Sequence, residues 1–110
     1  MATYTASELL ATTALGTSAG ATIFTASNKT IIKQILVANV TATDRTFNLH
    51  IVPNGGTAGA GNKVFGDVTV QANTTTVIDL ATVIDASDFI AGDASAASAL
   101  NVHISGVEVS

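Results

Sequence analysis

The chain has 110 residues, a length typical of one domain, and only 11% of them are charged although 47% are hydrophobic. Four Lys plus Arg against eight Asp plus Glu give a formal net charge of −4, which excludes a nucleic-acid binder that neutralises phosphates with a basic face. The hydrophobicity argues against intrinsic disorder, and the absence of Cys excludes disulfides, thiolate metal sites and cysteine nucleophiles. A monomer with so little surface charge should be poorly soluble, so we expect copies of itself or a partner to cover much of its surface.

Residues 1–20 differ in character from the rest of the chain. They carry Tyr4, Leu9, Leu10 and Leu15 and end in a Gly- and Ser-containing stretch at 16–20. No basic residues precede the apolar ones, as they would in a signal peptide, and no stretch in the chain approaches the roughly 18 apolar residues of a membrane span. We therefore expect an N-terminal arm over 1–20 that docks on its own domain or on a neighbour, followed by one β-sandwich domain over 21–110.

The remainder of the chain alternates apolar and polar residues with a period of two. Phe47, Leu49 and Ile51, for example, alternate with Asn48 and His50. This alternation is typical of half-buried strands, and the many Val, Ile and Thr residues suit a pleated surface. Strands are predicted near 21–25, 31–40, 46–52, 63–70, 74–80, 88–91 and 99–109. This spacing predicts an all-β fold, an antiparallel β-sandwich or jelly roll of seven to eight short strands with an N-terminal arm.

Two strands depart from simple alternation. Residues 31–40 are apolar on both parities, with Ile35 and Val37 on one of them, so the strand should be covered on both faces. The second cover would be the N-terminal segment or a neighbouring subunit, or the strand is simply central and contains a bulge. In the last strand the parity changes after Ile104, which predicts a β-bulge at Ser105–Gly106.

The Gly-rich stretch 54–63 invites comparison with a phosphate-binding loop. Gly56 and Gly61 have the required spacing, but Asn62 stands before Lys63 and a strand rather than a helix follows. We interpret the stretch as a hairpin loop whose tip can touch a partner.

The two histidines have similar surroundings. His50 and His103 each share parity with an Asn two residues earlier, on the side away from the expected core. The two imidazoles would be neighbours if their strands paired, but zinc would need a third protein ligand. We interpret both as outward polar residues of a sheet face or an interface.

The acidic residues do not form a recognisable catalytic or metal motif. Asp79, Asp85, Asp88 and Asp93 lack the spacing of a calcium loop, and we assign Asp85 and Asp88 to turns, with a cation site as the alternative. A Gly-x-Ser-x-Gly sequence is absent. We expect no enzyme, no cofactor and no metal.

Four stretches resemble a known group of proteins: residues 14–25, 26–39, 49–59 and 102–108. Together they resemble small β-sandwich virion proteins of tailed bacteriophages, most of all the capsid decoration, or cement, proteins. The resemblance implies a homotrimer on the capsid surface of the virion that binds the major capsid protein and stabilises contacts between capsomers. It implies no catalytic residues. We expect the interface to use Tyr4, Leu9, Leu10, Leu15, Ile35, Val37, His50 and His103.

A second interpretation is a phage tail or fibre module that binds a receptor or glycan through the tips 53–62 and 85–93. The chain has no Trp to form a platform for a sugar. A tail-tube or head-completion protein would share the physical features of a decoration protein. None of these interpretations involves nucleic acid or a membrane.

Overall fold

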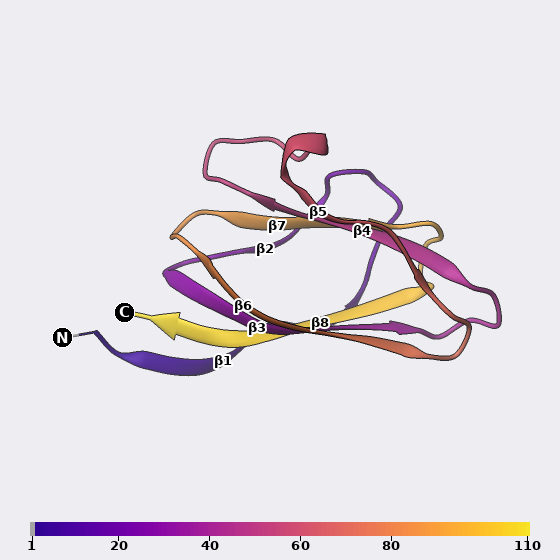
Figure 1. Ribbon diagram of the computed structural model, residues 1–110, viewed down its shortest axis with the longest axis horizontal. Coiled ribbons are helices and arrows are strands. Elements are labelled where there is room, and N and C mark those ends of the chain that lie inside the picture. The colour runs from indigo at the N-terminus through magenta and orange to yellow at the C-terminus, as the bar shows by residue number, and fades with distance from the viewer. Residues whose placement is uncertain (1) are drawn as a thin grey trace.

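The computed structural model describes residues 2–110, which form two antiparallel four-stranded sheets that face each other (Figure 1). The predicted all-β sandwich is confirmed. No helix among the described residues is long and apolar enough to cross a membrane. The elements are β1 (Tyr4–Ala14), β2 (Thr22–Thr25), β3 (Lys29–Asn39), β4 (Arg45–Val52), a 3-10 turn η1 (Ala60–Asn62), β5 (Lys63–Val70), β6 (Thr75–Ile84), β7 (Phe89–Ala94) and β8 (Leu100–Val109).

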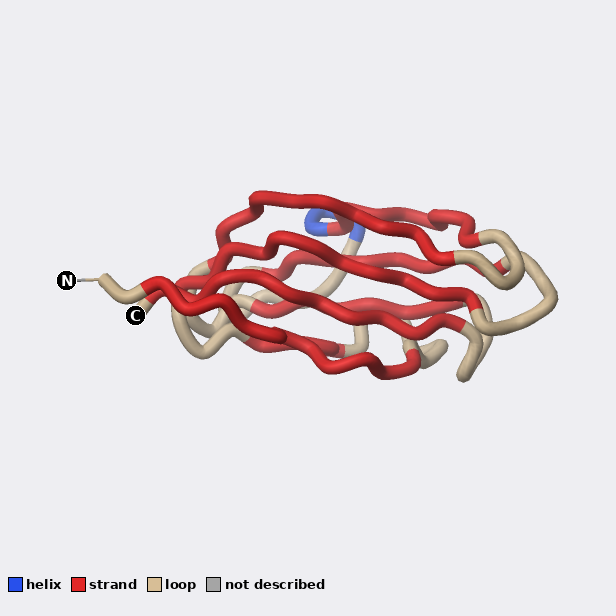
Figure 2. Tube along the Cα trace, turned by 90° about the horizontal axis from the view of Figure 1, so that it is seen from below, coloured by secondary structure: helices blue, strands red, loops and turns tan. Residues whose placement is uncertain are grey.

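The strand order is that of a jelly roll. One sheet has the order β1-β8-β3-β6 and the other β2-β7-β4-β5. The pairs β4–β5, β3–β6, β2–β7 and β1–β8 are all antiparallel, so the chain pairs as one long nested hairpin that is rolled into two layers. Figure 2 shows the first sheet from its outer side, with strands that run along the length of the molecule.

Because successive side chains of a strand point to opposite faces, every second side chain lies between the two sheets. In β4 the inward residues Phe47 and Leu49 are almost completely buried, and in β8 so are Leu100, Val102 and Ile104. All seven predicted strands are present. Their ends differ most in β6, which continues to Ile84, and in β7, which continues to Ala94.

The N-terminal segment expected as an arm forms an edge strand of its own domain. β1 pairs along β8 from Tyr4 opposite Val109 to Ala14 opposite Asn101. The Leu15 amide then donates to the Leu100 carbonyl at 2.8 Å. The docking site of this segment is therefore the free side of β8.

The irregularity predicted in the last strand lies in its neighbours, which corrects the prediction. β8 alternates without interruption through Ser105 and Gly106. The register shifts lie between Ile32 and Gln34 in β3 and between Glu8 and Leu10 in β1. Gly106 faces the core at this level, where a Cβ would overlap the Ile31 carbonyl oxygen. The absence of a side chain lets the neighbouring backbone come close.

The same shift explains the two-faced pattern of residues 31–40. The extra residue, Lys33, moves the following residues to the opposite parity. Ile32, Ile35 and Val37 therefore all face the core, although Ile32 has the other parity in the sequence. The other face carries Ile31, Leu36 and Ala38, which are half-buried on the outer side of the sheet.

Candidate functional site

Three of the eight expected interface residues belong to the core, which corrects their assignment to an interface. Leu15, Ile35 and Val37 are 1%, 3% and 0% exposed. Their side chains are covered within this chain, so a partner cannot reach them. The pattern of residues 31–40 misled the assignment because a bulge changes parity and makes one buried face look like two.

The remaining expected residues of the N-terminal segment lie on β1. Tyr4 is 68% exposed at the start of this strand, whereas Leu9 and Leu10 pack partly buried against the core. Only Tyr4 of this group presents most of its side chain to solvent.

The two histidines lie on different sheets. His50 is on β4 and His103 on β8, and these strands belong to opposite layers, so the histidines are not neighbours. Both share the parity of the outward residues, as expected. His103 lies on the surface of its sheet, but His50 is only 6% exposed, which corrects its assignment to an interface.

His50 is buried beneath the loop between β4 and β5. Its Nδ1 lies 3.1 Å from the Gly59 carbonyl oxygen and 3.1 Å from Asn62 Oδ1. Both partners are acceptors, so Nδ1 carries the proton. Asn62 Oδ1 also accepts from the Gly59 amide at 3.0 Å, and its Nδ2 donates to the Thr57 carbonyl at 2.9 Å. The Gly-rich loop is thus held by hydrogen bonds on the outer face of the sheet.

Beside His50 the same face contains an open pocket of about 230 Å³, lined about equally by polar and apolar surface. Asn48 Nδ2 donates to Asp93 Oδ2 at 3.2 Å, and Asn48 Oδ1 accepts from the Asp67 amide at 2.8 Å. Lys63 enters from the start of β5. Sequence reasoning placed these residues on separate strands and loops, and only the pairing of β4 with β7 brings Asn48 opposite Asp93.

His103 lies in a shallow groove of about 370 Å³ on the outer face of the other sheet, lined mainly by apolar surface. Its Nδ1 is 3.2 Å from the Thr12 hydroxyl, and its Nε2 is 3.8 Å from a carboxylate oxygen of Glu8. Leu36 and Ala38 of β3 form part of the groove. The contribution of β1 to this groove was not predicted, because the segment was not recognised as a strand.

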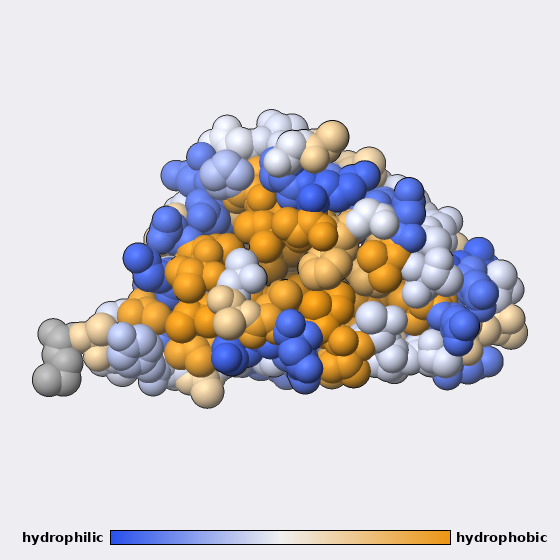
Figure 3. Space-filling view, viewed as in Figure 1, coloured by the Kyte–Doolittle hydropathy of each residue, from blue (hydrophilic) through white to orange (hydrophobic). Residues whose placement is uncertain are grey.

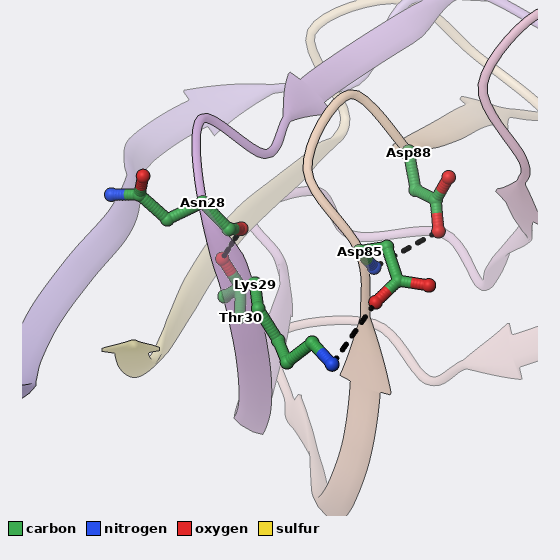
Figure 4. Close-up of polar contacts among 5 residues, drawn as sticks. All are labelled: Asn28, Lys29, Thr30, Asp85 and Asp88. Carbon is green, nitrogen blue, oxygen red and sulfur yellow. Dashed lines mark hydrogen bonds and ion pairs between the residues drawn. The ribbon is translucent and has the colours of Figure 1, made fainter. Parts of the chain in front are cut away.

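Asp85 and Asp88 shape a turn, as the sequence predicts, whereas Asp79 and Asp93 lie in strands. Figure 4 shows the β2–β3 turn beside the β6–β7 turn. Asp88 accepts hydrogen bonds from the amides of Asp85 and Asn54 at 3.0 and 2.9 Å, and Lys29 Nζ lies 3.5 Å from Asp85 Oδ1. No group of three or more metal-ligating side chains gathers within residues 2–110.

One side of the sandwich exposes apolar residues. It is bounded by β5 and β6, one edge strand of each sheet, and Figure 3 shows apolar residues gathered in the band between them. Val77 and Val83 of β6 are 54% and 55% exposed and pair with Leu36 and Ile31, so they point to the outer face of the sheet beside this band. Further apolar residues of these strands are only partly buried against the core: Phe65, Val68, Ile78 and Leu80. The sequence cannot identify this surface, because a strand becomes an edge only through the topology.

The comparisons with known proteins identify a fold. No family model matches the chain, and no curated protein matches it. A chain in a solved structure of infectious bursal disease virus, Gx strain, has a similar fold, with a TM-score of 0.51 and 16% sequence identity. The match covers 99% of this chain and 32% of that chain, so this chain spans about a third of the viral chain's length.

Proposed function

We propose that the chain is a structural virion protein of the capsid decoration class. It binds the major capsid protein on the outer surface of a phage head and stabilises contacts between capsomers. The observation that carries the proposal is the eight-stranded jelly roll, an architecture that recurs in viral capsids. The likeness to a chain of a virus structure over 99% of this chain supports it.

The surface suits a protein that acts by contact. Only 11% of the residues are charged, so burying part of the surface costs little desolvation of ions. Burial of apolar area stabilises a contact by about 25 cal/mol per Å² before the costs of association are subtracted. Many copies on one shell make a small gain per copy sufficient.

Location in the particle tests this proposal. Purified virions are labelled with an antibody against the folded chain and imaged by electron microscopy. We expect label distributed over the head, and purified shells should retain the added chain on sedimentation. Label confined to the tail, or shells that do not bind the chain, would refute a decoration role.

The open pocket beside His50 favours a second candidate, a tail or fibre module that binds a glycan. Lys63 is a donor there and Asp93 an acceptor, and sugar hydroxyls complement both. Asp93→Asn removes the charge and keeps an acceptor for Asn48. Asp79→Asn is the matched control, because Asp79 also accepts from an amide, Gln34 Nε2, at 3.2 Å on the opposite sheet. Glycan-array or cell binding that is lost only in the Asp93 variant would support this candidate, and absence of binding by the unaltered chain would reject it.

A further inference from the structure

Two loops that are far apart in the sequence enclose the open pocket beside His50 (Figure 1). One of them connects β1 to β2, and both of its ends bond to β7. The Gly92 amide donates to the Ala21 carbonyl at 2.9 Å. The Ala94 amide donates to the Gly16 carbonyl at 2.8 Å. This loop is therefore held against the sheet on one side of the pocket.

The Gly-rich loop between β4 and β5 forms the opposite wall. Hydrogen bonds of His50 and Asn62 hold it over the sheet. A Cβ built at Gly20 would lie 3.3 Å from Ala58 Cβ, so the two loops come close together at this point. Gly20 has a φ of 77°, which residues with a side chain rarely adopt. Both walls are thus fixed by contacts within the chain, and a ligand can bind with little loss of loop freedom.

The floor of the pocket presents two hydrogen-bond acceptors. Asp93 Oδ2 accepts from Asn48 Nδ2, which leaves Oδ1 for a ligand. His50 Nδ1 donates to the loop, so Nε2 of the neutral ring is an acceptor. Within residues 2–110, Arg45 Nε is the one fully buried side-chain nitrogen or oxygen without a partner. His50 Nε2 therefore keeps a small contact with solvent, and His50 lines the pocket.

The pocket also holds two opposite charges apart. Lys63 and Asp93 both line it, and neither takes part in an ion pair within residues 2–110. They belong to β5 and β7, which flank β4, so their backbones are about 10 Å apart. A bare anion would be repelled by the Asp93 carboxylate. The arrangement instead complements a ligand with an anionic group at one end and hydroxyl donors at the other.

We propose that this pocket binds one acidic sugar unit, a hexose ring that carries a carboxylate. The carboxylate lies against Lys63, and ring hydroxyls donate to Asp93 Oδ1 and His50 Nε2. The CH groups of the ring face the methyl groups of Ala58 and Ala60. A sugar ring has both polar and apolar surface, as the lining of the pocket has.

The size of the pocket limits the ligand to a single ring. Its volume of about 230 Å³ is smaller than the roughly 300–1,000 Å³ of pockets for drug-sized molecules. The inference rests on the second candidate function, which it makes more specific, and is independent of the decoration role.

NMR titration of the isotope-labelled full chain, at neutral pH and constant ionic strength, tests the inference. D-Glucuronate should bind with a dissociation constant of about 1 mM, as expected of one sugar ring. The amides of residues 19–20, 58–63 and 93 should shift, and those of β8 should not. D-Glucuronamide, in which a neutral amide replaces the carboxylate, and D-glucose should bind about fivefold more weakly.

Two variants separate the roles of the charges. Lys63→Gln should weaken the binding of D-glucuronate about fivefold and leave that of D-glucuronamide unchanged, because only the carboxylate interacts with the lysine. Asp93→Asn should weaken the binding of both about tenfold, since it removes the charged acceptor of the ring hydroxyls. Lys33→Gln is the matched control, because Lys33 is an exposed lysine of β3 in the other sheet, and it should change neither value. The dispersion of each spectrum shows whether the variant is folded.

The outcomes distinguish this inference from the candidate function on which it rests. D-Glucuronamide or D-glucose that binds as tightly as D-glucuronate would overturn the inference and leave the glycan candidate in place. Inorganic phosphate that shifts the same amides with equal affinity would also overturn it, because the site would then accept any anion. If D-glucuronate causes no shift in the pocket, the inference is wrong, and the glycan array decides the candidate function separately.

Discussion

Gly106 is the position where a single methyl group should cost most. It is buried in β8 between β1 and β3, and a Cβ there would overlap the Ile31 carbonyl oxygen and lie 3.0 Å from Leu9 Cδ1. The leucine can rotate away, but the carbonyl belongs to the backbone of a paired strand. The overlap can therefore be removed only if β3 and β8 move apart, which stretches the hydrogen bonds between these two central strands of the sheet.

The expected cost of Gly106→Ala lies at the upper end of the range for overpacking, about 3 kcal/mol. For a domain of this size that loss lowers the melting temperature by roughly 10–20 °C. Urea unfolding and thermal melts followed by circular dichroism, at one fixed protein concentration, measure both values.

Gly16→Ala is the control for the same chemical change. No atom lies within 4 Å of a Cβ built at Gly16, and its φ is not positive. We expect it to be neutral or stabilising by up to about 1 kcal/mol, through the smaller entropy of the unfolded chain. If the two variants have equal stability, the close approach of β3 to β8 is not what requires glycine at 106.

Three further predictions concern polar contacts. Asn39 is buried, and its side chain donates to the carbonyls of Thr43 and Val70 and accepts from the amide and the hydroxyl of Thr41. Asn39→Ala should therefore lower the free energy of unfolding, measured in urea, by about 2–4 kcal/mol. A loss below about 1 kcal/mol would contradict this. His50→Leu removes the anchor of the Gly-rich loop; we expect amide hydrogen exchange to accelerate over 57–62 and not in β8, and uniform acceleration would instead indicate global destabilisation. Lys29→Ala breaks the exposed ion pair of Figure 4, and urea unfolding should show a change in stability of no more than about 1 kcal/mol.

The strands of residues 22–109 are predictable because the alternation of apolar and polar residues in each one shows which face is buried. In β4 and β8, inward Leu, Ile, Val or Phe alternates with outward Asn or His, so both the element and its buried face can be read locally. The sequence of β1 does not show this alternation. Leu9 and Leu10 are adjacent at a register shift, and most of its other residues are exposed Thr, Ala and Ser of an edge strand.

The surfaces could be predicted only in part. The outward direction of His50 and His103 follows from parity, but their separation onto two sheets depends on which strands pair. Likewise, Ile35 and Val37 look available for an interface until the shift at Lys33 turns them inward. A bulge of one residue reverses the face of everything beyond it, and the alternation pattern alone does not show whether a break is a bulge or a second exposed face.

Local residue order was thus enough for the all-β class, seven of the eight strands, the turn positions of Asp85 and Asp88 and the scarcity of surface charge. Those properties depend on side-chain period, branching and charge within a few residues. The nested pairing, in which β1 meets β8 at the far end of the chain, depends on contacts between distant segments. That pairing leaves β6 as an edge strand beside an open apolar band. A strand is an edge when no further strand pairs with one of its sides. Its own sequence does not show this, because it depends on how distant segments of the chain pair.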